Sequence, residues 1–363
     1  MSHGGSAPSA GLPASPPVVL PRLTGMRAFA ALAVFLFHLD VWGVVRLPGG
    51  VSRAGFVGVG FFFVLSGFVL AWGTRPDLPT LRFYRRRFAR VWPSHAVVLA
   101  VAAVLPVVAV HRDVPSGVAN ALLVQAWSPD PEVVYSFNGV SWSLSCEAFF
   151  YLVFPVAALV VRRLPRRVAG GLAVLGLLLA LLAGLLRPEL AFHLPLVRVG
   201  EFLVGLVAGV AVRDGWRPRP RGAVVVPVVL AALAAVLVVP PPVADVVAAV
   251  PFLLVVLHAA RRDLDGRRGW LTSRTVVFAG EASFAFYLVH ELTVLNLRDL
   301  VPGPVAGRVA VIVVVATTAA VVLHLAVERP CNRWLRDRAP SVALASPPLL
   351  DDTAAETSRT RRD

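Results

Sequence analysis

Two residues in the first apolar stretch, Arg27 and His38, have types and a spacing that could serve proton transfer. They are eleven residues apart, which is close to three turns of an α-helix, so they share one face, with His38 about 16 Å further along the axis. Histidine is the side chain best suited to moving a proton near neutral pH. Ionisable groups inside an apolar segment are costly, which makes each one a functional candidate. The alternative is a histidine that only hydrogen-bonds between helices and an arginine that extends to the interface.

A carboxylate and an arginine-rich segment add to these candidates. Glu147 belongs to the apolar stretch that begins SWSLSCEAFFY, about 8 Å from the end of the predicted helix. A carboxylate at this depth must face protein or a wet cavity. The segment FYRRRFARVWP brings together Arg86, Arg87 and Arg90. Arg87 and Arg90, at i and i+3, share a helix face that could hold the phosphates of a nucleotide-like ligand. The alternative is that these arginines set the membrane orientation and attract anionic lipids.

Other polar residues favour structural explanations. Ser66 has no base at a readable spacing, which favours packing over nucleophilic attack. Arg198 and Glu201, at i and i+3, are expected to neutralise each other, whereas Glu281 and His290 fall on opposite faces of one helix. The sequence contains no metal-binding motif, P-loop or glycine-rich nucleotide motif. We therefore expect no bound metal and no bound cofactor.

The elements that must position these residues are apolar segments of membrane-spanning length. Of the 363 residues, 57% are hydrophobic and 15% are charged, whereas a soluble domain has about 25% charged residues. Ten apolar blocks are each long enough to cross a bilayer core of about 30 Å. Because lipid offers the backbone no hydrogen-bond partner, all ten are predicted to be helices, which makes the chain an all-α polytopic membrane protein. The blocks are approximately 26–46, 55–73, 91–111, 142–161, 168–186, 194–212, 222–240, 242–259, 275–297 and 305–327.

The distribution of charge predicts the orientation of these helices. All 35 basic residues are arginines, and the loops after even-numbered blocks hold 19 of them against 6 in the loops after odd-numbered blocks. Since cytoplasmic loops carry the basic excess, both termini are predicted to be cytoplasmic. The net charge of +14 is split among loops on one membrane face, which argues against nucleic-acid binding. Residues 1–21 and 339–363 are predicted to be disordered tails that flank a membrane domain of residues 22–338.

Seven sequence blocks, in order between residues 23 and 335, resemble the acyltransferase-3 family of membrane O-acyltransferases. They are LTGMRAFAALAVFLFH, GVGFFFVLSGFVL, FYRRRFARVWP, SWSLSCEAFFYLVFP, GEFLVGLVAG, SFAFYLVH and ERPCNRWL. The resemblance implies transfer of an acyl group, commonly acetyl from acetyl-CoA, to a hydroxyl group. The chain departs from the family pattern at four places, which are Thr24, Ala28, Gly60 and the pair Glu291-Leu292.

The resemblance also implies roles for individual residues. His38 would be the catalytic base and Arg27 its paired basic residue, while Glu147 would orient His38 or bind the acceptor. Direct transfer and a two-step route through an acyl-enzyme both remain open. The residues expected to hold the phosphates of acyl-CoA, entering from the cytoplasmic face, are Arg86, Arg87 and Arg90. The residues expected to contact the substrate are Asp40, Trp142, Ser143 and His290.

The predicted function is an integral membrane O-acyltransferase of the plasma membrane. It would transfer an acyl group, in particular acetyl, from acyl-CoA to a hydroxyl of a carbohydrate, a cell-envelope glycan or a glycosylated secondary metabolite. Its partners would be acyl-CoA, the hydroxylated acceptor and the lipid bilayer, and no nucleic acid. The alternative is a proton-coupled transporter or exporter that uses the same intramembrane histidine, glutamate and arginine residues. The sequence shows no internal repeat, which disfavours the inverted-repeat transporter folds.

Overall fold

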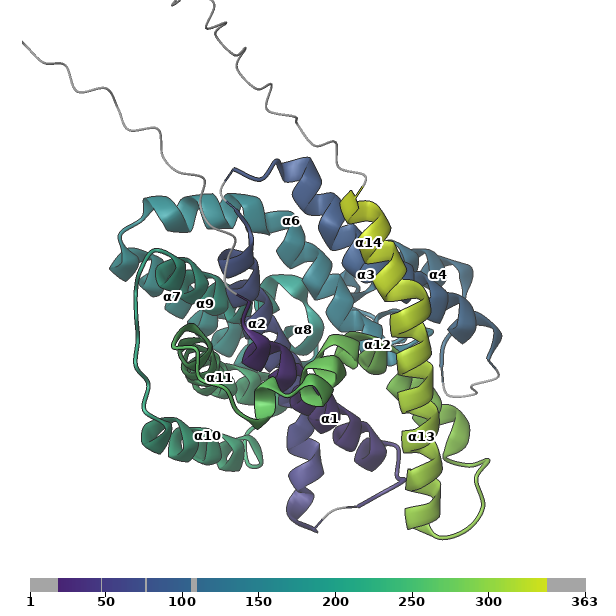
Figure 1. Cartoon of the computed structure of the whole chain (residues 1–363). Helices are drawn as coiled ribbons and strands as arrows, with labels where there is room; N and C mark the ends of the chain where they lie inside the picture. Colours follow the sequence, from purple (N-terminus) through teal and green to yellow (C-terminus); the bar gives the residue numbers. More distant parts are fainter. Residues whose placement is uncertain (1–18, 47, 76, 106–109, 338–363) are drawn as a thin grey trace, which may run out of the picture.

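The computed structural model describes residues 19–46, 48–75, 77–105 and 110–337, and within these ranges it contains helices and connecting turns but no β-strand (Figure 1). The all-α prediction is therefore confirmed. Each of the ten predicted apolar blocks overlaps a long helix. These helices are α1 (Pro21–Val41), α2 (Gly58–Gly73), α3 (Thr80–Val104), α6 (Trp142–Arg163), α7 (Arg166–Leu186), α9 (Pro195–Arg213), α10 (Gly222–Val236), α11 (Pro241–Leu264), α12 (Arg274–Leu297) and α13 (Val305–Leu323).

Seven helical segments within the described ranges are long and apolar enough to cross a membrane. They are Pro21–Val41, Ala54–Gly73, Gly139–Arg163, Arg166–Leu186, Pro195–Arg213, Pro241–Leu264 and Val305–Trp334. Of the three remaining helices, α10 has 15 residues, and α3 and α12 carry charged residues of the site described below. The chain is thus a multi-pass membrane protein, whereas ten spans and cytoplasmic termini stay predictions. The predicted tail at 339–363 and nearly all of that at 1–21 lie outside the described residues.

The arginine-rich segment is part of a helix that is longer at its start than the predicted apolar block. The predicted span begins at residue 91, but α3 begins at Thr80, directly after Pro79, and runs to Val104. Arginine is a good helix former, and its long side chain carries the charge away from the apolar helix surface. Arg87 and Arg90 therefore extend from a rigid element, one helical turn apart.

Two glycines allow the helices that carry the site to touch along their backbones. At Gly280 of α12, a Cβ atom would lie 1.8 Å from the carbonyl oxygen of Thr24 on α1. At Gly205 of α9, a Cβ atom would lie 1.9 Å from the carbonyl oxygen of Val64 on α2. Small residues at such crossings are what bring membrane helices into close contact. α1 thus packs closely against α12, and it also contacts α2 (Figure 1).

Short helices connect the long ones on both sides of the site. Between α3 and α6 the chain forms α4 (Val114–Ala121), α5 (Pro131–Val134) and the 3-10 turns Gln125–Trp127 and Gly139–Ser141. This segment is tied to α12, because the Asn138 side-chain amide donates to the carbonyl of Leu288 at 2.9 Å. After α13, a π-helical segment (His324–Glu328) leads into α14 (Arg329–Asp337). Such π-segments often occur at functional sites.

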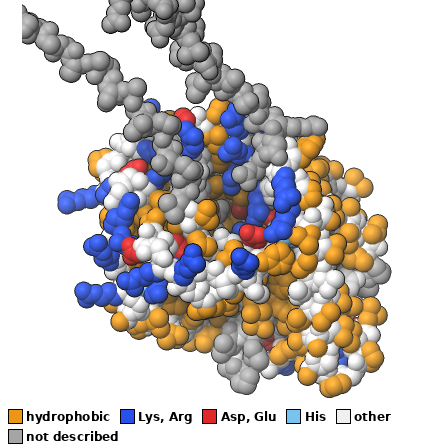
Figure 2. All heavy atoms as spheres, viewed as in Figure 1, with side chains coloured by type: hydrophobic (Ala, Val, Ile, Leu, Met, Phe, Trp, Pro, Cys, Tyr) orange, Lys and Arg blue, Asp and Glu red, His pale blue; other side chains and the backbone are white. Residues whose placement is uncertain are grey.

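The surface separates charge from apolar side chains. In Figure 2 the arginine side chains gather over the left and centre of the face turned to the viewer, whereas the right and lower flank is mainly hydrophobic. Many large apolar side chains on α6, α7 and α13 are exposed, among them Leu152, Leu179 and Val314. A broad apolar flank of this kind is what contact with lipid requires.

Candidate active site

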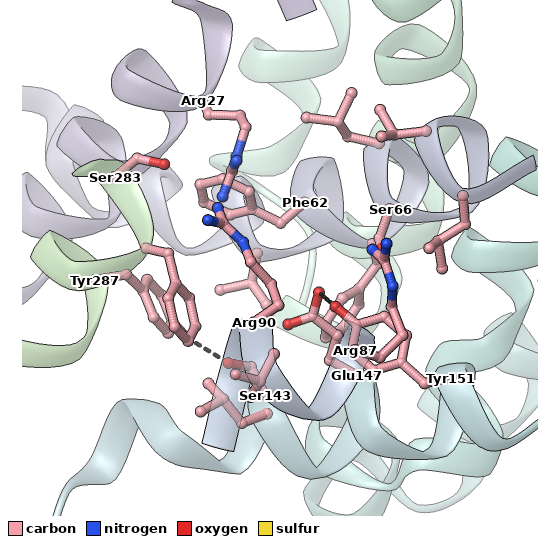
Figure 3. A pocket seen from close by; sticks show the side chains of 18 of the residues that line it. Arg27, Phe62, Ser66, Arg87, Arg90, Ser143, Glu147, Tyr151, Ser283 and Tyr287 are labelled. Carbon is pink, nitrogen blue, oxygen red and sulfur yellow. Dashed lines mark hydrogen bonds between the residues drawn. The ribbon is translucent and has the colours of Figure 1, made fainter. Parts of the chain in front are cut away.

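A pocket of about 540 Å³ lies among α1, α2, α3, α6, α12 and α14 (Figure 3). Its apolar wall comes mainly from α2, in which Phe62 and Phe63 face the cavity. Its polar and aromatic lining converges from helices that are far apart in the sequence. These polar and aromatic lining residues are Arg27, Ser66, Arg86, Arg87, Arg90, Ser143, Glu147, Tyr151, Ser283, Tyr287 and Asn332. A concave site with a few convergent polar groups is typical of a small-molecule site.

The arginines of this pocket differ in how their charge is balanced. Arg27 and Arg90 extend toward each other from α1 and α3 (Figure 3). Arg90 forms an ion pair with Glu328, which is buried on the π-helical segment. Among the described residues no carboxylate pairs with Arg27 or Arg87, and the Nε atom of Arg87 is buried without a hydrogen-bond partner. The guanidinium of Arg87 lies 5.9 Å from the centre of the Tyr151 ring. The pocket therefore offers positive charge to a ligand.

Glu147 belongs to this arginine pocket and not to His38. Its carboxylate accepts a hydrogen bond from the Tyr151 hydroxyl, one turn further along α6 (Figure 3). Among the described residues the carboxylate beside His38 is Glu291 on α12, and no contact joins Glu147 to His38, so the predicted orienting role of Glu147 is not supported. The spacing of residues along one helix shows which of them share a face, but not which neighbouring helix that face contacts. Glu147 remains a lining residue of the pocket.

His38 sits in a second cluster, formed where α1 crosses α12. Its Nδ1 atom lies 2.8 Å from the carbonyl oxygen of Val34 and 3.2 Å from Nε2 of His290. Its Nε2 atom lies 3.5 Å from Oε1 of Glu291. His290 is completely buried, and its ring centre is 5.6 Å from that of Tyr287. Since Tyr287 also lines the pocket, it connects the arginine pocket with the His38 cluster.

The four predicted substrate contacts have different surroundings. The hydroxyl of Ser143 lines the pocket and lies 2.8 Å from the hydroxyl of Tyr287. His290 contacts His38 and not the pocket. Asp40 accepts a hydrogen bond from the Ser52 hydroxyl at 2.7 Å and does not line the pocket. For Asp40 and His290, direct contact with a ligand in this pocket is therefore not supported.

Trp142 packs against a buried ion cluster and does not line the pocket, so its predicted contact with the substrate is not supported there. The guanidinium of Arg198 lies 5.8 Å from the centre of the Trp142 ring. The expected pairing of Arg198 with Glu201 is confirmed at 3.0 Å, and Asp245 on α11 joins as a third member. Gly60 leaves room for this cluster, because a Cβ atom there would lie 2.6 Å from Oε1 of Glu201. Trp142 thus packs in the core.

Two further carboxylates in these clusters were not identified as site residues from the sequence. Glu291 is visible in the sequence as a departure from the family pattern directly after His290. Glu328 begins the ERPCNRWL block, and it joins Arg90 to His324, whose Nδ1 lies 2.8 Å from Oε2 of Glu328. His324, which no sequence pattern singles out, therefore supports the arginine pocket indirectly. Both glutamates are nearly completely buried, which a sequence pattern on one helix does not reveal.

Comparisons with known proteins point to one family. The model of the acyltransferase-3 family, described as an acyltransferase domain, matches residues 20–326. The chain is 37% identical to the acyltransferase MdmB of Streptomyces mycarofaciens over 380 residues, which covers 92% of this chain and 97% of MdmB.

Two further relatives match over shorter regions. The peptidoglycan O-acetyltransferase OatA of Listeria monocytogenes is 29% identical over 167 residues, covering 39% of this chain and 24% of that protein. The O-acetyltransferase OatA of Staphylococcus aureus is 30% identical over 187 residues, covering 45% of this chain and 29% of that protein. This chain thus spans less than a third of either OatA protein. No solved structure matches. The chain belongs to the acyltransferase-3 family and is a multi-pass membrane O-acyltransferase.

Proposed function

We propose that this protein transfers an acetyl group from acyl-CoA to a hydroxyl of a carbohydrate, with the arginine pocket as the donor site and His38 as the base. The observation that carries the proposal is the pocket itself, in which Arg27 and Arg90 face each other and neither Arg27 nor Arg87 has a carboxylate partner among the described residues. Like charges that face each other across a cavity repel. An anionic ligand would relieve that repulsion, and arginine is well suited to phosphate.

The distance along α1 supports acyl-CoA in particular. Arg27 lines the pocket, and His38 follows eleven residues later on the same helix, which is about 16 Å at the rise of an α-helix. The phosphates and the thioester of acyl-CoA lie at opposite ends of its pantetheine arm. A basic site at one end and a histidine at the other match this layout. The arm would pass Phe62 and Tyr287, whose ring centres are 6.2 Å apart.

The proposed reaction needs one proton acceptor at His38. The acceptor hydroxyl gives its proton to Nε2 of His38, and its oxygen bonds to the carbonyl carbon of the thioester. The carbon–sulfur bond then breaks, and the CoA thiolate takes the proton from His38. Histidine can serve as base and then as acid in this way. We propose direct transfer, and a two-step route through an acyl-enzyme is the competing mechanism.

A carbohydrate acceptor and the plasma membrane are the finer parts of the proposal. The name of the Listeria relative, a peptidoglycan O-acetyltransferase, supports a sugar hydroxyl as acceptor. The match to MdmB covers nearly the whole of both chains, which supports a catalytic unit of this size. The acceptor would be an envelope glycan or a glycosylated metabolite, and both are accessible at the plasma membrane.

The test uses purified protein in nanodiscs with radiolabelled acetyl-CoA and a panel of glycans and glycosylated metabolites. We expect label to move to a product with the wild type, and transfer by His38→Ala to fall by about 100-fold or more because general base catalysis is lost. His258→Ala is the matched control, because that histidine bonds to the carbonyl of Pro220 and does not line the pocket. Folded His38→Ala that transfers at the wild-type rate would contradict the proposal.

A further inference from the structure

We propose that His290 and Glu291, consecutive residues on α12, set the tautomer of His38 and stabilise its protonated form, so that Glu291 is the positioning carboxylate of the reaction. The inference rests on the proposed role of His38 as the base. It adds two residues from another helix to that role, and it replaces Glu147 as the partner of His38.

The hydrogen bonds at Nδ1 of His38 determine its tautomer. The carbonyl oxygen of Val34, at 2.8 Å, can only accept, so Nδ1 of His38 must carry a hydrogen. The same reasoning applies to His290, whose Nδ1 lies 3.2 Å from the carbonyl oxygen of Phe286. Nε2 of His290 is then left with a lone pair, which faces the Nδ1 hydrogen of His38 at 3.2 Å. Both contacts therefore require a hydrogen on Nδ1 of His38, which the two acceptors share. Neutral His38 then has its lone pair on Nε2.

Oε1 of the Glu291 carboxylate lies 3.5 Å from this Nε2 atom. While His38 is neutral this arrangement is unfavourable, because two electron-rich groups meet in a buried site. Once Nε2 takes a proton, the imidazolium and the carboxylate attract each other strongly in a medium of low dielectric constant. In the proposed reaction Nε2 is the atom that receives the hydroxyl proton. Glu291 therefore stabilises the state that forms as the acceptor oxygen attacks the thioester carbon.

The surroundings hold the Glu291 carboxylate in place. Its Oε2 accepts from the backbone N–H of Val140 at 2.9 Å, and its Oε1 accepts from Nε1 of Trp42 at 3.2 Å. A Cβ atom at Gly139 would lie 2.7 Å from Oε2, so the turn before α6 closes on the carboxylate only because this residue is glycine. The side chain is 7% exposed. A carboxylate held by two donors can accept a hydrogen bond from His38 and fix its ring once Nε2 carries a proton.

The test compares charge with shape at position 291. Glu291→Gln keeps the volume and removes the charge, whereas Glu291→Asp keeps the charge and shortens the side chain. We expect Gln to lower kcat by about 100-fold, which is the size of a general acid–base contribution, with the KM for acetyl-CoA within about twofold of the wild type. Asp should retain more activity than Gln. Glu281→Gln on the same helix is the matched control, because Glu281 pairs with Arg329 at 2.8 Å.

The outcomes separate this inference from the proposed function. If Glu291→Gln is as active as the wild type, or more active than Glu291→Asp, then Glu291 contributes only to packing and the inference is overturned. His38 can still be the base in that case. If the wild type transfers nothing from acyl-CoA, or folded His38→Ala is fully active, the proposed function fails and this inference fails with it. Thermal unfolding in detergent shows which variants are folded. If Glu291→Gln does not fold, Glu291→Asp serves as the second probe.

Discussion

Arg87 and Arg90 stand one helical turn apart on α3, yet their environments differ. Arg90 is paired with the buried Glu328, so part of its charge is already offset. Arg87 packs against the rings of Phe83 and Tyr151, and its Nε atom has no partner. A buried donor without a partner is costly unless a ligand supplies one. At the scale of single residues, Arg87 is therefore the stronger candidate for contact with the donor.

Arg87→Gln should raise the KM for acetyl-CoA by about 10- to 100-fold, which is the value of a hydrogen bond to a charged group, with a smaller change in kcat. Arg85→Gln is the matched control, because Arg85 belongs to the same arginine run but does not line the pocket. Steady-state kinetics over a range of donor concentrations would measure both. Equal KM values for the two variants would show that Arg87 does not bind the phosphates of acetyl-CoA.

At the scale of elements, the close approach of α2 and α9 holds one wall of the pocket. The carbonyl oxygen of Val64 would meet a Cβ atom at Gly205, and the carbonyl oxygen of Phe202 would meet one at Gly67, 2.1 Å away. Since Phe62, Phe63 and Ser66 of the pocket lie on α2, a shift of this helix would also move the lining. Stability and donor binding are coupled at this crossing.

Gly205→Ala should therefore destabilise the protein by about 1–3 kcal/mol, as overpacking of a filled interior does. Gly170→Ala on α7 is the control, because a Cβ atom at Gly170 meets nothing within 4 Å. That change should be neutral or stabilising by up to about 1 kcal/mol, since alanine is the better helix former. Thermal unfolding in detergent would measure both. An unchanged Gly205→Ala protein would show that α2 and α9 can separate at no cost.

At the scale of the whole molecule, the charge distribution predicts which face lies in the cytoplasm. Arginine side chains gather on one face in Figure 2, and the predicted cytoplasmic loops hold 19 arginines against 6 in the other loops. The segment with α4 and α5 is predicted to lie outside. The donor pocket, lined by arginines of α1 and α3, would then open toward the compartment that holds acyl-CoA.

Single cysteines can test this orientation in intact cells. Cys146 is buried, so a Cys331→Ser background leaves little reactive thiol. A membrane-impermeant maleimide should label Val118→Cys, on the exposed side of α4, in intact cells. It should label Arg167→Cys, at the exposed start of α7, only after permeabilisation. Labelling of Arg167→Cys in intact cells would reverse the predicted topology.

The sequence by itself determined the membrane class, the helical fold and the family, because apolar length, charge asymmetry and ordered motifs are local properties of the chain. It also singled out Arg27, Arg87 and Arg90, which the structure brings to one pocket. The limits of α3 were predicted less well, because arginines suit a helix end at the interface as readily as a loop.

The tertiary structure alone decided which carboxylate meets which base. Glu147 turns to Tyr151 and the arginine pocket, whereas Glu291 reaches His38 from a helix about 250 residues further along the chain. Glu328 reaches Arg90 in the same way. Spacing along one helix states which residues share a face, but the rotation of that helix against its neighbours follows from backbone contacts such as Gly280 with Thr24. Those contacts exist only once the helices have packed.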